Sequence, residues 1–417
     1  MLIKKITTDV LRRKFFCEEQ IPFIEIKNEE NNIINIHKDE TYQKWMGLGG
    51  ALTGSTIYNF NKLSLEKQDK LLDDYYKGLN YNYLRLPIGS TDFSPKPVDD
   101  YTVDFDDNIR IINRIKEKKD IKILATPWSP PKKYKDNSSL YGGKLLKQFY
   151  GEYANYLVNF IKDYEFANIK IDYLSIQNEP FVNQRWESCT FSINEMKDFI
   201  YNYLIPKLKN TKIVLWDHNK DNLYNIFKRL YEKNSKIIGV GFHWYTGGFY
   251  EELDLIRKNY PKIILFETEM CCGFSRYKPR KWIKDSEYYI NEIINGINNG
   301  LNVFIDWNML LNYHGGPNHK FNNCKSPIIL NKWGNDYIKT PIYYYLKHIG
   351  IANKGTVLKT SSYSRNEELE VVAIQNEKTY ITVLNQSKDK KRINIRIGDN
   401  MIKDNIEKHS IVTYICN

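Results

Sequence analysis

Two glutamates in the chain each lie at the end of a short apolar segment. Glu179 follows the segment Tyr173–Gln177, and Glu269 ends the segment Leu265–Glu269. Two facing carboxyl groups can cleave a glycosidic bond, because one protonates the leaving oxygen while the other attacks the anomeric carbon. A gap of about 5 to 5.5 Å excludes an intervening water and retains the configuration of the sugar. We expect mutual repulsion and partial burial to keep the acid of such a pair protonated near neutral pH.

Further side chains that could serve such chemistry lie close to other apolar segments. Asn178, beside Glu179, could donate to a sugar 2-hydroxyl, and Trp128, Trp307 and His243 also follow or end apolar segments. Simpler interpretations exist for each. Asn-Glu-Pro is typical of a helix start, Glu269 could be a solvated loop residue, tryptophans usually pack in cores, and a histidine can be neutral and hydrogen-bonded. Their joint occurrence at segment ends favours the catalytic interpretation.

Eight short apolar runs alternate with longer amphipathic segments from about Trp45 onward. Several are continuous in Ile, Val and Leu, as strands covered by helices are. This alternation predicts repeated βα units closed into an α/β barrel, the (β/α)8 TIM barrel, whose active site lies at the C-terminal ends of its strands. The runs are Lys44–Thr53, Tyr83–Leu86, Lys122–Thr126, Tyr173–Gln177, Lys212–Asp217, Ile237–His243, Lys262–Glu267 and Leu301–Asp306.

The pattern changes after the helical segment Pro341–His348. Stretches of alternating hydrophobicity then predict an appended antiparallel β-sandwich module. Extended candidates Phe23–Ile26 and Ile33–Ile36 are expected to complete it from the other end of the chain. We therefore predict an N-terminal segment over 1–40, the catalytic barrel over 41–349 and the β-sandwich module over 350–417. The late stretches are Leu369–Ile374, Thr379–Leu384, Ile393–Ile397 and Ser410–Ile415.

Charge and cysteine content narrow the possible partners. The chain has 61 basic and 50 acidic residues, but the lysines are scattered, so no nucleic-acid partner is expected. The six cysteines lack the spacing of a metal site, and His243 has no matching ligand pattern, so we expect no metal and no other cofactor.

The start Met1–Asp9 lacks the apolar stretch of a signal peptide, and no run of 18 apolar residues follows. We expect a cytoplasmic protein with no stable membrane insertion.

A series of motifs, in order along the chain, resembles glycoside hydrolase family 30, the glucosylceramidase or acid β-glucosidase family. The similarity runs from about Trp45 to the C-terminus. The motifs are Gly47–Thr53, Arg85–Pro87, Asp92–Ser94, Pro127–Pro130, Asn178–Pro180, His243–Tyr245, Leu265–Cys271, Asp306–Asn308, Asn312, Gly315–Asn318 and Ser326–Ile329.

The resemblance implies a retaining β-glycosidase that acts on a carbohydrate or glycolipid. It makes Glu179 the general acid/base and Glu269 the nucleophile, with Glu267 as a neighbour that would point the same way on an ideal strand. It further implies a substrate-binding set in which Arg85 and Tyr245 orient Glu269. The other members of that set are Trp128, Asn178, His243, Trp307 and Asn322.

Gly54 departs from the family's pattern. The glucosylceramidases carry an acidic residue at this point, which grips distal sugar hydroxyls, and losing a charge-assisted hydrogen bond costs about 1.5 to 3 kcal/mol. A glucosylceramidase-like β-glucosidase is the leading prediction. A β-xylosidase, β-fucosidase or β-1,6-glucanase or galactanase is the alternative. A carbohydrate-binding pseudoenzyme is less favoured, because both carboxylates are present.

Overall fold

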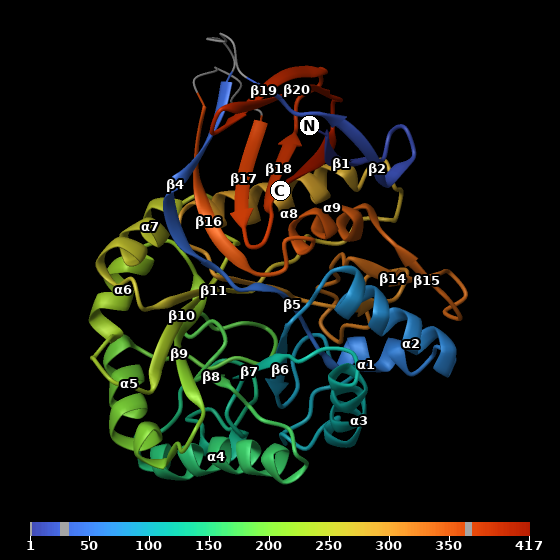
Figure 1. The fold of residues 1–417 in the computed structure, drawn as a ribbon. Helices are drawn as coiled ribbons and strands as arrows, with labels where there is room; N and C mark the ends of the chain where they lie inside the picture. The colour runs from blue at the N-terminus through green and yellow to red at the C-terminus, as the bar shows by residue number, and fades with distance from the viewer. Residues whose placement is uncertain (1, 26–32, 363–368) are drawn as a thin grey trace.

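The computed structural model describes residues 2–25, 33–362 and 369–417, in which a barrel lies below a separate sheet module (Figure 1). Eight parallel strands close the barrel in the order β10-β11-β12-β5-β6-β7-β8-β9. Each contains part of one of the eight predicted runs, so the predicted (β/α)8 barrel is confirmed. The strands are β5 (Gly47–Ala51), β6 (Tyr83–Ile88), β7 (Lys122–Pro127), β8 (Tyr173–Ser175), β9 (Lys212–Asn219), β10 (Ile237–His243), β11 (Ile264–Glu269) and β12 (Val303–Asp306).

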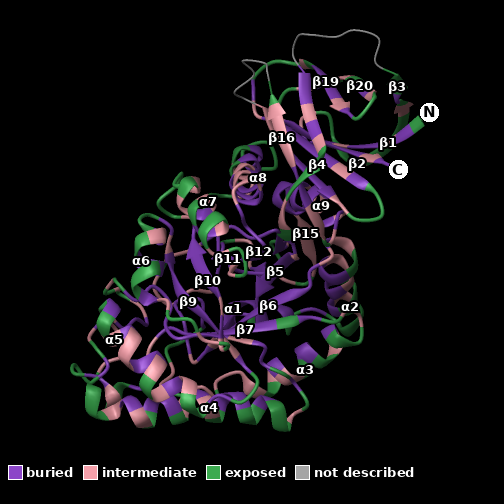
Figure 2. Cartoon of the chain, turned by 60° about the vertical axis from the view of Figure 1, so that its left-hand side comes forward, coloured by how far each residue is buried: buried purple, intermediate pink, exposed green. Residues whose placement is uncertain are grey.

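Amphipathic helices surround the barrel and bury their apolar faces against it, so that the strands are buried and the outer helix faces are exposed (Figure 2). In α3, for example, Ile111, Ile112 and Ile115 are buried on one face. The helices are α1 (Gly54–Phe60), α2 (Leu65–Asp73), α3 (Phe105–Lys116), α4 (Tyr150–Phe166), α5 (Ile193–Asp198), α6 (Leu223–Leu230), α7 (Tyr250–Asn259), α8 (Ile283–Asn298) and α9 (Pro341–Gly350). Short π or 3-10 turns are η1 (Asp74–Gly78), η2 (Lys132–Tyr134), η3 (Lys147–Phe149), η4 (Phe199–Leu204) and η5 (Ile205–Lys207).

The interior of the barrel is filled by side chains and is not a channel. A separate apolar cluster contributed by five strands packs there. Since this packing closes the middle of the barrel, a cavity can open only beyond it, at the strand ends. The cluster consists of Tyr83, Leu124, Val214, Phe266, Val303 and Ile305.

Strands from both ends of the chain form one ten-stranded sheet, in the order β2-β1-β21-β18-β17-β16-β4-β19-β20-β3. Its pairs are antiparallel except β4 with β19, which is parallel. Ile26, the end of one predicted strand, lies outside the described residues. The strands are β1 (Leu2–Asp9), β2 (Lys14–Pro22), β3 (Ile24–Glu25), β4 (Ile33–Trp45), β16 (Gly355–Ser362), β17 (Leu369–Gln375), β18 (Thr379–Asn385), β19 (Lys391–Ile397), β20 (Asn400–Ile406) and β21 (Ser410–Cys416).

Helix α9 joins the barrel to the sheet module. Its residue His348 is buried, with Nδ1 2.8 Å from Thr413 Oγ1 on β21 and Nε2 2.9 Å from Thr8 Oγ1 on β1. Burial lowers the pKa of His348 to about 3, so this imidazole is neutral at physiological pH. The contacts of His348 with the two strands are therefore neutral hydrogen bonds.

A small three-stranded sheet that was not predicted follows β12. Its strands are β13 (Leu310–Leu311), β14 (Ile328–Leu330) and β15 (Tyr337–Lys339). Among the described residues, none of the helices combines the length and apolar character needed to cross a bilayer.

Candidate active site

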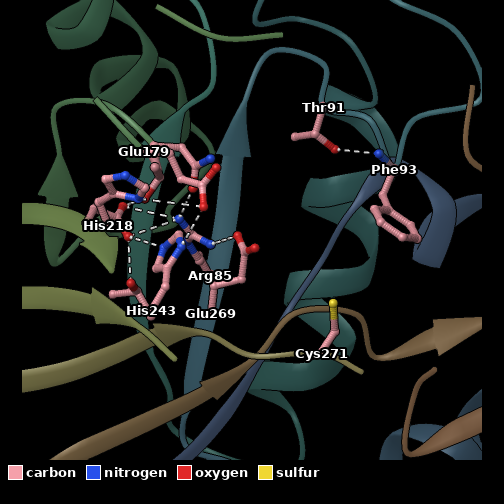
Figure 3. A network of polar contacts seen from close by, with 12 residues as sticks. Arg85, Thr91, Phe93, Glu179, His218, His243, Glu269 and Cys271 are labelled. Atoms are coloured by element: carbon pink, nitrogen blue, oxygen red, sulfur yellow. Dashed lines mark hydrogen bonds and ion pairs between the residues drawn. The ribbon is translucent and has the colours of Figure 1, made fainter. Parts of the chain in front are cut away.

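Arg85, on β6, lies at the centre of a polar network at the C-terminal end of the barrel (Figure 3). Its buried guanidinium donates to Glu269 Oε2 at 2.7 Å, to Asn178 Oδ1 at 2.9 Å and to Asp217 Oδ1 at 3.1 Å. A planar guanidinium with several fixed donors holds its partners in one geometry. Arg85 therefore positions groups from the ends of three other strands relative to one another.

Asp217 reaches this network because β9 contains a bulge. The pairing of β9 with β10 shifts by one residue, so that Gly241 pairs with Trp216 and Phe242 with His218. The backbone of Trp216 and Asp217 is left-handed, with φ of 71° and 77°. A bulge re-aims the side chains that follow it. Sequence alternation alone could not place Asp217 inside the barrel.

His243, at the end of β10, lies between two carboxylates. Its Nε2 is 3.1 Å from Asp217 Oδ1 and its Nδ1 is 3.3 Å from Glu179 Oε1. Burial lowers the pKa of His243, but the charge of Glu269 and the hydrogen bonds to Asp217 and Glu179 outweigh burial and raise it to about 9. At neutral pH His243 is thus an imidazolium that donates from both nitrogens, and the simpler interpretation of a neutral histidine is wrong.

Glu179 lies just beyond β8 with a left-handed backbone, φ 47°. Burial raises the pKa of its carboxyl, but the nearby imidazoles of His218 and His243 prevail and hold that pKa below its usual value. The expectation that Glu179 is protonated near neutral pH is therefore wrong for the free protein. The proton of this pair is on His243.

The two glutamates of β11 occupy different surroundings. Glu269 accepts from Arg85 and, at 2.9 Å, from the Tyr245 hydroxyl. Glu267 is fully buried, and burial together with the charge of Glu292 on α8 raises its pKa well above the usual value. The register of β11 against β10 shifts between these two residues. On an ideal strand both side chains would point the same way, but this irregularity breaks the alternation of β11, and their partners differ.

A cavity of about 630 Å³ opens above the network. Trp128 and Trp307 stack in its wall, with ring centroids 4.9 Å apart, and Arg85 lies 4.7 Å from the centroid of Trp128. Arg85 and His243 are not among the lining residues and act on the cavity through the glutamates. The predicted residues that line it are Trp128, Asn178, Glu179, Tyr245, Glu269, Trp307 and Asn322.

Asp92 supplies a further carboxyl group to the cavity, on the loop after β6. It is 3% exposed and accepts from Asn322 Nδ2 at 3.2 Å and Asn318 Nδ2 at 3.3 Å. Burial and the charge of Glu269 raise the pKa of Asp92 to about 7. Gly54 is not among the lining residues. A Cβ there would lie 2.9 Å from Asp104 Oδ2 and 3.1 Å from Ser94 Oγ.

Three residues at the site were not assigned from the sequence. Asp92 was visible only within the Asp92–Ser94 motif. Asp217 and His218 ended or followed a predicted run, but the bulge that turns Asp217 inward has no sequence signal. The thiols of Cys271 and Cys324 also line the cavity, 2.9 Å apart.

The chain matches a known family of enzymes and several of its members. The model of the glycosyl hydrolase family 30 TIM-barrel domain matches residues 45–351. "Putative glucosylceramidase 3" of Caenorhabditis elegans is 33% identical over 363 residues, which are 77% of this chain and 69% of that protein. The endo-1,6-beta-D-glucanase of Neurospora crassa is 29% identical over 266 residues, 57% of this chain and 55% of that protein.

The fold is also that of a solved structure. The crystal structure of SrfJ from Salmonella typhimurium superimposes with a TM-score of 0.93 at 28% identity, covering 100% of this chain and 99% of that one. The similarity therefore extends over both the barrel and the sheet module.

Proposed function

Because this chain belongs to glycosyl hydrolase family 30 and is a glycoside hydrolase, we propose that it is a glucosylceramidase-like β-glucosidase in which Glu269 is the nucleophile and Glu179 the general acid/base. The observation that carries the proposal is the shared guanidinium. Arg85 holds Glu269 and Asn178 at the cavity that Glu179 also lines. Double displacement requires two carboxyl groups positioned at one cavity.

The network suits each group to one step. Arg85 and the Tyr245 hydroxyl hold the Glu269 carboxylate in position for attack on the anomeric carbon. The proton needed by the leaving oxygen is on His243 in the free enzyme, 3.3 Å from Glu179. Glu179 passes that proton to the leaving oxygen and later takes one from the water that hydrolyses the glycosyl-enzyme. Asp217 keeps the histidine oriented throughout.

We expect sugar preference to depend on Asp92, which lines one wall of the cavity. A carboxyl group with two amide donors, Asn318 and Asn322, is an acceptor suited to distal hydroxyls, which Gly54 cannot provide. Asp92 thus takes the part expected of the family's acidic residue and supports a hexose such as glucose.

Covalent labelling tests the assignment of the nucleophile. A 2-fluoro-β-glucoside with a good leaving group should inactivate the enzyme and label Glu269 in a peptide map. Anomer-resolved NMR should show β-glucose as the first product. A label on Glu267, or an α product, would contradict the mechanism.

Substrate panels test the preference. We expect the highest kcat/KM on nitrophenyl β-glucoside and hydrolysis of glucosylceramide. Asp92→Asn should lower kcat/KM on the glucoside by about 10- to 100-fold and on the xyloside by less, because xylose lacks the exocyclic hydroxymethyl group. The similarity to an endo-1,6-beta-D-glucanase makes β-1,6-glucan the second candidate. Faster release from that polymer than from any β-glucoside would favour it.

A further inference from the structure

Three metal-ligating side chains converge on one point beside the cavity. They are Glu179 beyond β8, His218 on β9 and His243 on β10, and one ligand atom from each lies within 4.8 Å of the others. Glu179 Oε1 is 3.3 Å from His243 Nδ1 and 3.7 Å from His218 Nδ1. Ligands about 2.0 to 2.1 Å from a tetrahedral Zn²⁺ are roughly 3.3 to 3.4 Å apart. The separation of Glu179 and His243 therefore matches a tetrahedral site, and that of Glu179 and His218 is somewhat longer. A cation bound there would displace the proton of His243 Nδ1 into solvent.

His218 gives this cluster an unused ligand atom. The residue is 8% exposed, and its Nδ1 has no hydrogen-bond partner among the described residues. A buried polar nitrogen without a partner is uncommon. Because that nitrogen faces Glu179 Oε1, its position suits it to a cation that Glu179 also binds.

The surroundings of His243 match those of a metal-bound histidine. Its second nitrogen, Nε2, faces Asp217 Oδ1 at 3.1 Å, and Asp217 is in turn held by Arg85 and by the Thr268 hydroxyl at 2.5 Å. Metal-binding histidines usually present their other nitrogen to a carboxylate, which fixes the ring and increases its basicity. Glu179 and His218 line the cavity, so a fourth position is open to water or to a ligand.

We propose that Glu179, His218 and His243 form a binding site for a divalent transition-metal cation, Zn²⁺ above all, and that its occupancy inhibits the enzyme. Imidazole and carboxylate ligands with an open fourth position suit Zn²⁺ rather than Ca²⁺ or Mg²⁺, which prefer oxygen ligands only. The inhibitory consequence rests on the proposed role of Glu179, because a carboxylate bound to a metal can neither donate nor accept the catalytic proton. The binding itself does not depend on that role.

Cobalt(II) reports this site without any catalytic assay. Protein treated with a chelator and then titrated with Co²⁺ should show visible ligand-field bands that saturate at one equivalent and disappear when Zn²⁺ is added. His218→Phe and Glu179→Gln should each weaken Co²⁺ binding by at least about 10-fold. Two independent ligand variants keep the test valid if one of them does not fold. No one-equivalent band in the folded wild-type protein would overturn the proposal.

The cysteines of the same cavity are the matched control, because thiolates also bind Zn²⁺. Cys271→Ser and Cys324→Ser should leave the Co²⁺ spectrum unchanged, and His314→Gln, at an exposed histidine, should do the same. A sulfur-to-cobalt charge-transfer band that disappears in a cysteine variant would move the ion to the thiols and overturn the proposal.

Activity then tests the inhibition separately. Zn²⁺ should inhibit hydrolysis of the wild-type enzyme's best β-glycoside competitively, and His218→Phe should raise its inhibition constant by at least about 10-fold. An enzyme that hydrolyses glycosides but binds no Co²⁺ contradicts only the metal site. A protein that binds Co²⁺ as described but hydrolyses no glycoside contradicts only the proposed function. Binding without inhibition would refute the inhibitory role.

Discussion

Two buried histidines, His243 at the mouth of the barrel and His348 at the junction with the sheet module, show how differently the two regions are built. Both are almost inaccessible, at 0% and 1% exposure. His243 lies between carboxylates and has its pKa raised to about 9, whereas His348 lies between threonine hydroxyls and has its pKa lowered to about 3. Burial is equal, so the partners decide the charge. The active site concentrates charge for chemistry, while the surroundings of His348 at the junction keep this imidazole neutral.

We expect the largest difference between the active site and the junction when the proposed nucleophile is substituted, because activity is then lost. Glu269→Gln should reduce kcat by more than the ~10²- to 10⁴-fold contribution typical of an acid/base group, because no covalent intermediate can form. The melting temperature should fall slightly, because Arg85 loses one ionised partner while a glutamine oxygen can still accept its hydrogen bond. Circular dichroism melts and single-turnover rates measure both. Activity close to that of the wild type would show that Glu269 is not the nucleophile.

The acid/base residue should show a dependence on leaving group. Glu179→Ala should lose most of a ~10²- to 10⁴-fold contribution with a poor leaving group. With a good leaving group it should accumulate the glycosyl-enzyme, and azide should restore turnover. Equal losses on both substrates, without rescue by azide, would exclude Glu179 from proton transfer.

The junction should respond in the opposite way. His348→Phe keeps the ring volume but leaves Thr8 without this partner, so it should lower stability by about 1 to 3 kcal/mol. His348→Gln, which can still donate and accept, should lose less. Neither change should alter kcat/KM by more than about twofold at a temperature where both variants are folded. A matching loss of activity would mean that the two regions are coupled.

Acid should weaken the junction through the same histidine. The folded-state pKa of His348 is about 3 and the unfolded value about 6.5, so the unfolded chain takes up the proton first. This contribution to stability is present above pH 6.5 and falls by up to about 1.4 kcal/mol per pH unit as the pH drops toward 3. Urea melts at several pH values should show a smaller slope for His348→Gln than for the wild type. An unchanged slope would assign the acid sensitivity to other groups.

Alkaline pH should lower activity through His243 in the active site. The raised pKa of His243 means that its stabilising proton is fully present below pH 6.5 and is lost as the pH rises through about 9. The proton supply of Glu179 is lost over the same range, so kcat/KM should fall with an apparent pKa near 9. His243→Gln should move that limb to lower pH. A wild-type rate that stays constant to pH 10 would show that His243 does not supply the proton.

The sequence predicted the barrel well because its signals are local. Continuous apolar runs such as Ile237–His243 became strands with nearly the same bounds, and Glu179 and Glu269 were found at the strand ends. Protonation could not be predicted in the same way. The state of Glu179 depends on histidines of β9 and β10, whose proximity only the closed barrel reveals.

Side-chain direction was the other limit. Period-two reasoning assumes regular strands, but the bulges at Asp217 and between Glu267 and Glu269 break that period at the active site. Irregular backbone, such as the positive φ of Glu179, is often found where function requires it. The small sheet containing β13 was missed because a two-residue strand has no measurable periodicity.

The pairing of β1 with β21 has a consequence for how the protein is made. Lys4 pairs with Ile415 and Thr8 with Ile411, so β1 cannot complete its pairing until the distant strand β21 has been synthesised. Barrel strands mostly pair with neighbours close in the chain and can assemble earlier, while contacts of such long sequence separation form slowly. Until β21 has been synthesised, the hydrogen-bonding edge of β1 that β21 later covers stays open to other chains. Neighbouring nascent copies on one polysome can therefore mispair at this edge.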